Sequence, residues 1–217
     1  MMPVVSIVGQ GKSGKTTLIE KLIPELKSRG YRVATVKHTH QNLELDTPGK
    51  DSWRYAQAGS DAVFISTPKN LVLIESVEQD VSIKDITRLI SAACDILLVE
   101  GFHDAHVPKV EVHRKETGKE LRCTPKELRA IVTDEHVDAD LPQFGLNDAS
   151  GIADFIETKL VGNRHDETAL LVNGEPVTLN RFAQDILTGS ILGMLSTLKG
   201  MDEEIKSVEV TFRKTVG

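Results

Sequence analysis

"GQGKSGKTT", residues Gly9 to Thr17, decides the fold class of this 217-residue chain. The stretch matches the pattern G-x-x-x-x-G-K-[ST] at every fixed position. An apolar, β-branched run at 4–8 precedes it, and apolar residues at helical spacing follow it over 15–30. A strand, a glycine-rich loop and a helix in this order predict a P-loop NTPase-like α/β fold.

The residue types of this loop suit phosphate binding. Gly9, Gly11 and Gly14 let the backbone bend so that successive N–H groups point at phosphate oxygens. The helix that follows adds the positive end of its dipole. Lys15 is expected to reach the β- and γ-phosphates, and the Thr16 hydroxyl to bind Mg²⁺. The predicted phosphate site comprises Gly9, Gly11, Lys12, Ser13, Gly14, Lys15, Thr16 and Thr17.

Further along the chain, strand and helix patterns alternate. Strands are predicted at 31–38, 61–66, 71–76, 95–101 and 128–134, and helices at 50–59, 82–93 and 147–160. This alternation predicts a mostly parallel sheet with helices on both faces. "KVEVHR" and "ELRC" flank "KETGK", and we expect a protruding hairpin over 109–123. Ligands of such sheets bind at the carboxyl ends of the strands.

The chain changes character after about residue 160. A polar stretch at 161–168 precedes an Asn-Gly hairpin pattern, a helical pattern at 180–200 and an alternating run at 205–214. We predict a nucleotide-binding domain over 1–162 and a small α+β (ββαβ) module over 163–217. A module of this size is marginal for independent folding, so a docking or dimerising role is expected.

Composition limits the function classes. The net charge is −6, which gives no electrostatic footprint for nucleic acid. No segment approaches the roughly 20 apolar residues of a membrane span, and the N-terminus does not resemble a signal peptide. Cys94 and Cys123 form no C-x-x-C pair and are expected to be reduced. A cytoplasmic protein without nucleic-acid or membrane partners is predicted.

Two further stretches carry candidate site residues. Glu100 ends the apolar run 96–99, so its carboxylate is expected near the phosphate loop, as a metal ligand or as a solvated strand end. The segment 36–54 is longer than an ordinary connection and is either a γ-phosphate sensor or a charged surface loop. Its charged and imidazole side chains are Lys37, His38, His40, Glu44, Asp46, Lys50, Asp51 and Arg54. Asp46 and Glu100 are the candidate catalytic groups and, with Thr16, the candidate metal ligands.

Four stretches, in order, resemble the MobB family, the P-loop proteins of molybdopterin-guanine dinucleotide synthesis. They are "GQGKSGKTTLIEKLI", "KHTHQNLELDTPGKDSWRYAQAGSDA", "LLVEGF" and "PKVEVHR". The second is the most distinctive, because very many families share a P-loop. The resemblance covers roughly residues 3 to 160. The chain departs from the family pattern at Gln41, where a histidine is expected, and at His103, where a lysine is expected.

The resemblance implies GTP binding with Mg²⁺, at most a weak GTPase activity, and an accessory role beside the MobA guanylyltransferase, which joins GMP to molybdopterin. It also implies a homodimer formed through an extended β-segment, which 109–123 would supply. The residues that carry over are the phosphate site Gly9, Gly14, Lys15, Thr16 and Thr17, the strand-end Glu100, and the second motif His38, His40, Asp46, Lys50 and Asp51.

The choice of base and two rival functions remain open at this point. The N-K-x-D motif of many GTPases is absent, and Asp134 either pairs with guanine or is an ordinary turn residue. A metal-insertion GTPase of the nickel-chaperone type would need ligands among His38, His40, His103, His106 and Cys94. A small-molecule P-loop kinase would need a base such as Asp46 and a lid of arginines, for which Arg54 is the candidate.

Overall fold

The computed structural model describes most of the first 161 residues and part of the remainder. The described residues are 2–39, 46–90, 93–118, 120–161, 168, 170–172, 175–177, 179–198, 208 and 210–211. Contacts divide the chain into two compact units, residues 2–163 and residues 164–217 together with Met1.

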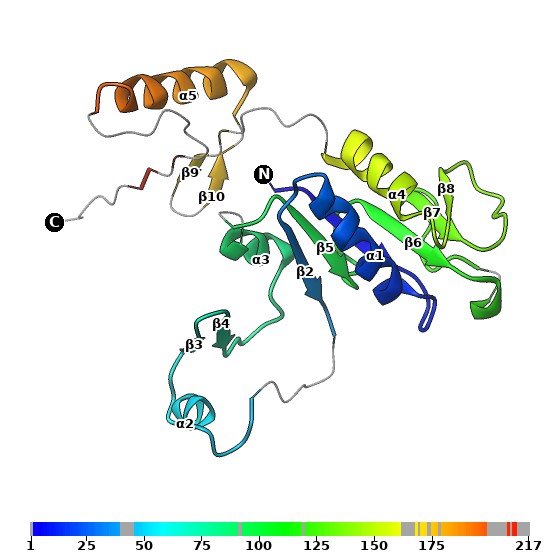
Figure 1. Ribbon diagram of the computed structural model, residues 1–217, viewed down its shortest axis with the longest axis horizontal. Coiled ribbons are helices and arrows are strands. Elements are labelled where there is room, and N and C mark those ends of the chain that lie inside the picture. Colours follow the sequence, from blue (N-terminus) through cyan, green and yellow to red (C-terminus); the bar gives the residue numbers. More distant parts are fainter. Residues whose placement is uncertain are drawn as a thin grey trace. The chain divides into compact units, whose positions relative to one another are not determined.

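The larger unit is built on a six-stranded sheet with the order β2-β5-β1-β6-β7-β8 (Figure 1). Every neighbouring pair in it is parallel, as the alternating pattern predicts. The carboxyl ends of all these strands therefore lie along one edge. The strands are β1 Val4–Val8, β2 Val33–Lys37, β5 Ile96–Glu100, β6 Lys109–His113, β7 Leu128–Thr133 and β8 Gln143–Gly145.

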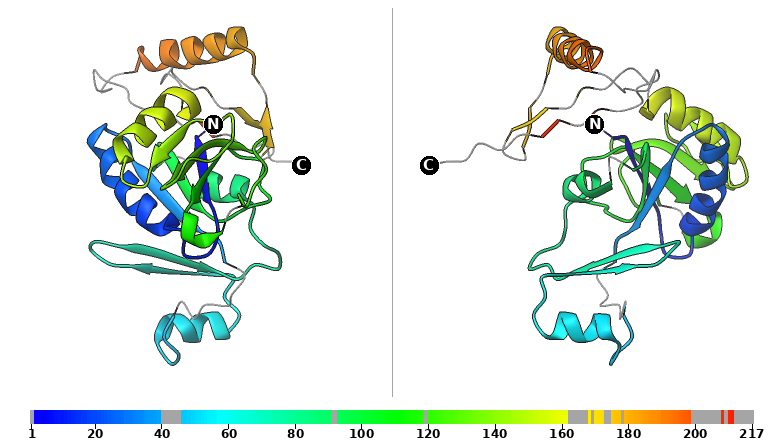
Figure 2. Two further views of the ribbon diagram at one scale, coloured as in Figure 1. Left: turned by 90° about the vertical axis from the view of Figure 1, so that its right-hand side faces the viewer. Right: turned by 60° about the vertical axis from the view of Figure 1, so that its left-hand side comes forward.

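Helices cover both faces of this sheet, which confirms the predicted layers (Figure 2). α1 (Lys15–Ser28) and α4 (Ala149–Phe155) pack on one face, and α3 (Ile83–Ile90) packs on the other. The apolar positions of α1 recur at helical spacing and face the core, where each buried leucine or isoleucine contributes about 1.5–3 kcal/mol. α1 ends where Gly30 adopts a φ of 85°.

The predicted strands after the second motif do form, but outside the main sheet. β3 (Ala62–Ser66) and β4 (Leu71–Glu75) pair antiparallel as a separate two-stranded ribbon. α2 (Asp51–Gln57) precedes this ribbon and packs against β3. We call β3 and β4 the ribbon below.

The hairpin predicted over 109–123 is wrong. β6 is an interior strand, paired with β1 on one side and β7 on the other, and a short 3₁₀ helix (Lys115–Thr117) follows it. The alternation of polar residues in β6 looks like that of a half-exposed strand. Yet Lys109, Glu111 and His113 are all buried, because loops after β6 and β7 cover that face and supply polar partners.

The smaller unit begins as predicted. β9 (Leu170–Val172) pairs antiparallel with β10 (Glu175–Val177), and α5 (Arg181–Leu195) follows. The side chain of Asn180 caps α5 by accepting a hydrogen bond from the N–H of Ala183 at 2.9 Å. Most of the predicted strand at 205–214 lies outside the described residues. No helix within the described part of either unit has the length and apolar character needed to span a bilayer.

Candidate functional site: a phosphate loop at the sheet edge

The loop between β1 and α1 bends sharply at its glycines. Gly9 has a φ of 140° and Gly14 a φ of 101°, values that favour glycine. A Cβ on Gly9 would lie 2.3 Å from the carbonyl oxygen of Val112, so the loop starts in direct contact with β6. The Lys15 ammonium curls over the loop and donates hydrogen bonds to the carbonyl oxygens of Gly9 at 3.2 Å and Gln10 at 2.8 Å.

Lys15 is surrounded by groups of both signs. Burial lowers the pKa of Lys15, and the negative charge of Glu100 opposes that change. The positive charges of Arg122 and Lys37 lower the same pKa further. Lys37 therefore lies close to the loop, at the end of β2 and level with Glu100 in the parallel register. A site with several cations beside a glycine-rich loop at the start of a helix is suited to a polyanion such as a nucleoside triphosphate.

The structure brings together Thr16 and Glu100, two of the three candidate metal ligands. The Thr16 hydroxyl donates a hydrogen bond to Oε2 of Glu100 at 2.9 Å. The arrangement arises because β5 lies beside β1, so the carboxyl end of β5 meets the start of α1. A hydroxyl and a carboxylate are oxygen ligands of the kind that Mg²⁺ prefers, and the pair fits that ion.

His38 lies at the same edge of the sheet and is held by several contacts. Its Nε2 lies 2.7 Å from Oδ2 of Asp80, and its ring stacks on Phe102 with a centroid distance of 4.1 Å. Its backbone N–H donates to the carbonyl oxygen of Glu100 at 2.9 Å. His38 thus ties the end of β2 to the residues that follow β5.

The remaining described residues of the second motif make their contacts within their own segment. His40 lies outside the described residues. Asp46 accepts a hydrogen bond from the N–H of Thr47, and Asp51 pairs with Arg54 at 3.7 Å. Lys50 directly precedes α2. Within the part of the chain that the structure describes, no hydrogen bond or ion pair joins Asp46, Lys50 or Asp51 to the phosphate loop.

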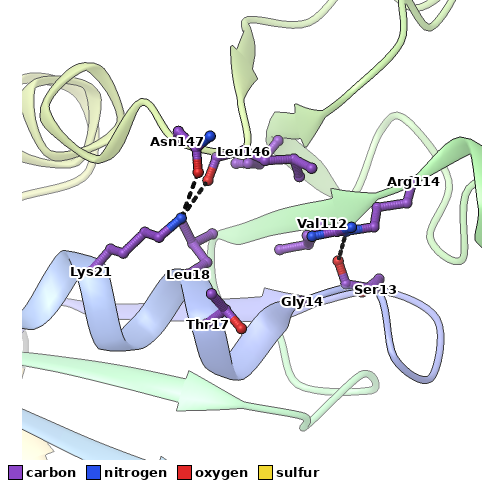
Figure 3. A pocket seen from close by; sticks show the side chains of 10 residues that line it. Ser13, Gly14, Thr17, Leu18, Lys21, Val112, Arg114, Leu146 and Asn147 are labelled. Carbon is purple, nitrogen blue, oxygen red and sulfur yellow. Dashed lines mark hydrogen bonds between the residues drawn. The ribbon is translucent and has the colours of Figure 1, made fainter.

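A cavity of about 110 Å³ adjoins the other side of the loop (Figure 3). The ammonium of Lys21 closes one wall by donating to Oδ1 of Asn147 at 2.7 Å. Arg114 forms another wall, with its Nε bonded to the carbonyl oxygen of Ser13 at 3.0 Å. The lining residues are Ser13, Gly14, Thr17, Leu18, Lys21, Val112, Arg114, Val132, Leu146 and Asn147. Asp134 follows β7 at the same edge of the sheet, where it accepts a hydrogen bond from the N–H of Lys115.

Sequence reasoning missed Arg114, Lys21 and Asn147 as parts of this site. Arg114 directly follows a strand, which is the signal that identified Glu100, but the strand was assigned to a hairpin. Asn147 directly precedes Asp148, whose side chain caps α4 by accepting a hydrogen bond from the N–H of Gly151. Over the described ranges, no group of three or more His, Cys, Asp or Glu residues is placed to hold a metal ion. The nickel-chaperone alternative thus gains no ligand set there.

Comparisons with known proteins agree with this geometry. The family model described as molybdopterin guanine dinucleotide synthesis protein B matches residues 4–134. The molybdopterin-guanine dinucleotide biosynthesis adapter protein of Haemophilus influenzae is 38% identical over 73% of this chain and 90% of its own length. A protein of Methanocaldococcus jannaschii is 26% identical and covers 96% of this chain. The crystal structure of Bacillus subtilis MobB is 30% identical with a TM-score of 0.58, covering 75% of this chain and 100% of that one.

Proposed function

The chain belongs to the family of molybdopterin guanine dinucleotide synthesis protein B, and on that premise we propose that it is a GTP-binding adapter in molybdenum cofactor biosynthesis. Its proposed role is to assist a MobA-like guanylyltransferase that attaches GMP to molybdopterin. The observation that carries the proposal is the convergence of Lys15, Thr16 and Glu100 at one edge of a parallel sheet. That arrangement suits a nucleotide with its metal.

Each residue of the site has a proposed task. The loop backbone from Gly9 to Thr17 would donate N–H groups to phosphate oxygens, and Lys15 would turn from the loop carbonyls to the terminal phosphates. Thr16 and Glu100 would hold Mg²⁺, which supplies charge neutralisation when bound. Asp46 could position the attacking water if its segment approached the loop. Because no hydrogen bond joins Asp46 to the loop within the described residues, we propose at most a weak GTPase activity.

The cavity beside the loop suits the nucleoside part of the ligand. A nucleotide whose phosphates rest on the loop must place its sugar and base to one side, and the hollow beside Gly14 and Thr17 is adjacent. Asn147 offers an amide there, and Asp134 directly follows β7 at the same edge of the sheet. We propose that guanine is held between these two strand-end segments, with the Asp134 carboxylate accepting from guanine N1–H and N2–H₂.

Calorimetry with GTP and ATP, each with Mg²⁺, tests this function. We expect tighter binding of GTP, and we expect Asp134→Ala to weaken GTP binding about tenfold while leaving ATP binding unchanged, since hydrogen bonds to a charged group are lost. Asp138→Ala, another exposed aspartate after β7, is the matched control. Equal affinity for both nucleotides would contradict the guanine assignment, and formation of ADP with a phosphorylated acceptor would favour a kinase.

We also propose a homodimer, but with a different segment from the one expected. The stretch 109–123 cannot offer a free edge, because β6 is paired on both sides. The ribbon has the required properties. Its register places Phe64 opposite Leu73, and with Leu71 these side chains form one face that is 64%, 40% and 70% exposed. An exposed apolar strand pair favours association with another chain, which would bury the apolar side chains.

Phe64→Glu is expected to shift the protein from dimer to monomer. Burial of a phenylalanine contributes about 1.5–3 kcal/mol, and the change occurs once in each subunit, so the dissociation constant should rise by at least about 100-fold. Sedimentation velocity over a concentration series measures it. Leu89→Glu on α3, where the leucine is 65% exposed, is the matched control and should leave the dimer intact. A monomeric parent protein, or a dimeric Phe64 variant, would contradict the proposal.

A further inference from the structure

Glu111 is a charged residue in an unexpected place. It lies in the middle of the interior strand β6, and its side chain is fully buried. Both carboxylate oxygens are used: one accepts a hydrogen bond from the backbone N–H of Arg122 at 2.6 Å, and the other from that of Cys123 at 3.0 Å. A buried carboxylate is costly unless it is fully hydrogen-bonded, and here its partners are two backbone groups of one loop. Glu111 therefore fixes that loop to the sheet.

The register of the sheet shows where the loop is fixed. Glu111 lies level with Val8 in the parallel pairing of β1 and β6. Val8 is the last residue of β1, directly before Gly9 and the phosphate loop. Val8 and Cys123 also share one apolar cluster, on the face of the sheet opposite α1. The backbone of Arg122 is thus held at the level where the phosphate loop begins.

Among the residues that the structure describes, none is a partner that would explain the position of the Arg122 side chain. It is exposed, and no side-chain hydrogen bond or ion pair joins it to any residue that the structure describes. The positive charge of Arg122 nevertheless acts on Lys15 and His103, two groups near the proposed nucleotide site. Together with burial, which acts more strongly, it lowers the pKa of Lys15 and that of His103. Buried Nδ1 of His103 also lacks a hydrogen-bond partner among the described residues.

The Lys15 ammonium bonds to the carbonyl oxygen of Gly9, and Glu111, level with Val8 one residue earlier, holds the backbone of Arg122. Two cations held at the start of one phosphate loop suit an anion that both can contact. Lys15 is the residue expected to meet the terminal phosphates, and Glu100, the acid whose charge acts on Lys15, is already bonded to Thr16. We propose that Arg122 is a further phosphate-binding residue, whose guanidinium contacts the terminal phosphate of the bound triphosphate beside Lys15, and that Glu111 positions it. This inference rests on the proposed nucleotide-binding function and assigns one more residue to that site.

The test compares GTP with GDP on the whole protein. We expect Arg122→Ala to weaken binding of Mg·GTP by about tenfold or more, because charge-assisted hydrogen bonds to phosphate are lost, and to change GDP binding less than about twofold. Arg122→Lys should restore part of the difference, since it keeps the charge without the planar fork. The backbone N–H groups that bind Glu111 remain in both variants, so the fold is retained. Arg129→Ala, an exposed arginine in the first half of β7, is the matched control.

A second variant tests the role of Glu111. Glu111→Gln keeps the shape of the side chain but replaces one acceptor oxygen with a donor, so one loop N–H loses its partner. We expect the ratio of GTP to GDP affinity to fall in this variant as well, which a purely structural role would not produce. Equal weakening of GTP and GDP binding by Arg122→Ala, or no weakening of either, would overturn the assignment. Failure of the parent protein to bind either nucleotide would instead refute the proposed function itself, and this inference with it.

Discussion

Lys15→Ala is expected to weaken binding of GTP and GDP by at least about 100-fold, because two or more charge-assisted hydrogen bonds to phosphate are lost. The free energy of unfolding should change by less than about 0.5 kcal/mol, as for other partly exposed positions without a core contact. Of the residues that the structure describes, the ammonium bonds only to the carbonyl oxygens of Gly9 and Gln10 in its own loop. The side chain therefore serves the ligand and contributes little to the core.

Calorimetry gives the affinities and urea unfolding gives the stability. Lys27→Ala, an exposed lysine in the last turn of the same helix, is the control and should bind nucleotide like the parent protein. If the Lys15 variant retained its affinity for GTP, the phosphate-site assignment would fail. If it bound poorly but also unfolded at much lower urea, the loss could not be assigned to the ligand contact.

Gly9→Ala is expected to lower the free energy of unfolding by about 3 kcal/mol or more. The added methyl group would lie 2.3 Å from the backbone oxygen of Val112, and the φ of 140° is one that alanine rarely adopts. Overpacking and backbone strain each cost about 1–3 kcal/mol. Relief by movement is restricted, because β6 is held between two neighbouring strands.

Gly11→Ala provides a control within the same loop. Among the described residues, no atom beyond its chain neighbours lies within 4 Å of a Cβ at that position, so the stability of this variant should match that of the parent protein. Urea unfolding followed by circular dichroism compares the three proteins. Equal midpoints for the two variants would contradict the close approach of the loop to β6.

The parts of the fold that sequence predicted well are those with strong local signals. The apolar run before Gly9 and the helical spacing after Lys15 are decided by neighbours in sequence, and both elements form as expected. β6 was misassigned because its polar residues find partners far along the chain. Glu111 bonds to residues 122 and 123, and His113 lies 3.3 Å from a carboxylate oxygen of Glu135. An alternating pattern indicates where polar groups are, but not which loop will cover them.

The residues of the candidate site also fall into two groups, those that the sequence predicts and those that it does not. The nearness of Thr16 and Glu100 follows from strand ends meeting at one edge, which a parallel sheet guarantees once its strands are known. Arg114 and Asn147 line the cavity because Arg114, after β6, contacts Ser13 of the phosphate loop, and Asn147, after β8, contacts Lys21 of α1. Such contacts depend on the order of strands in the sheet, and no local pattern encodes that order.

The contact between His38 and Asp80 has a consequence for how this architecture can change. These two residues contact each other at the base of an excursion of the chain between them, which contains α2, β3 and β4. The chain leaves and rejoins the sheet-bearing body at nearly one point. Insertion, deletion or exchange of this excursion would thus leave the strand order and the phosphate loop untouched. The scaffold thus consists of two separable parts: the excursion, which carries the exposed ribbon, and the parallel sheet, which carries the phosphate loop.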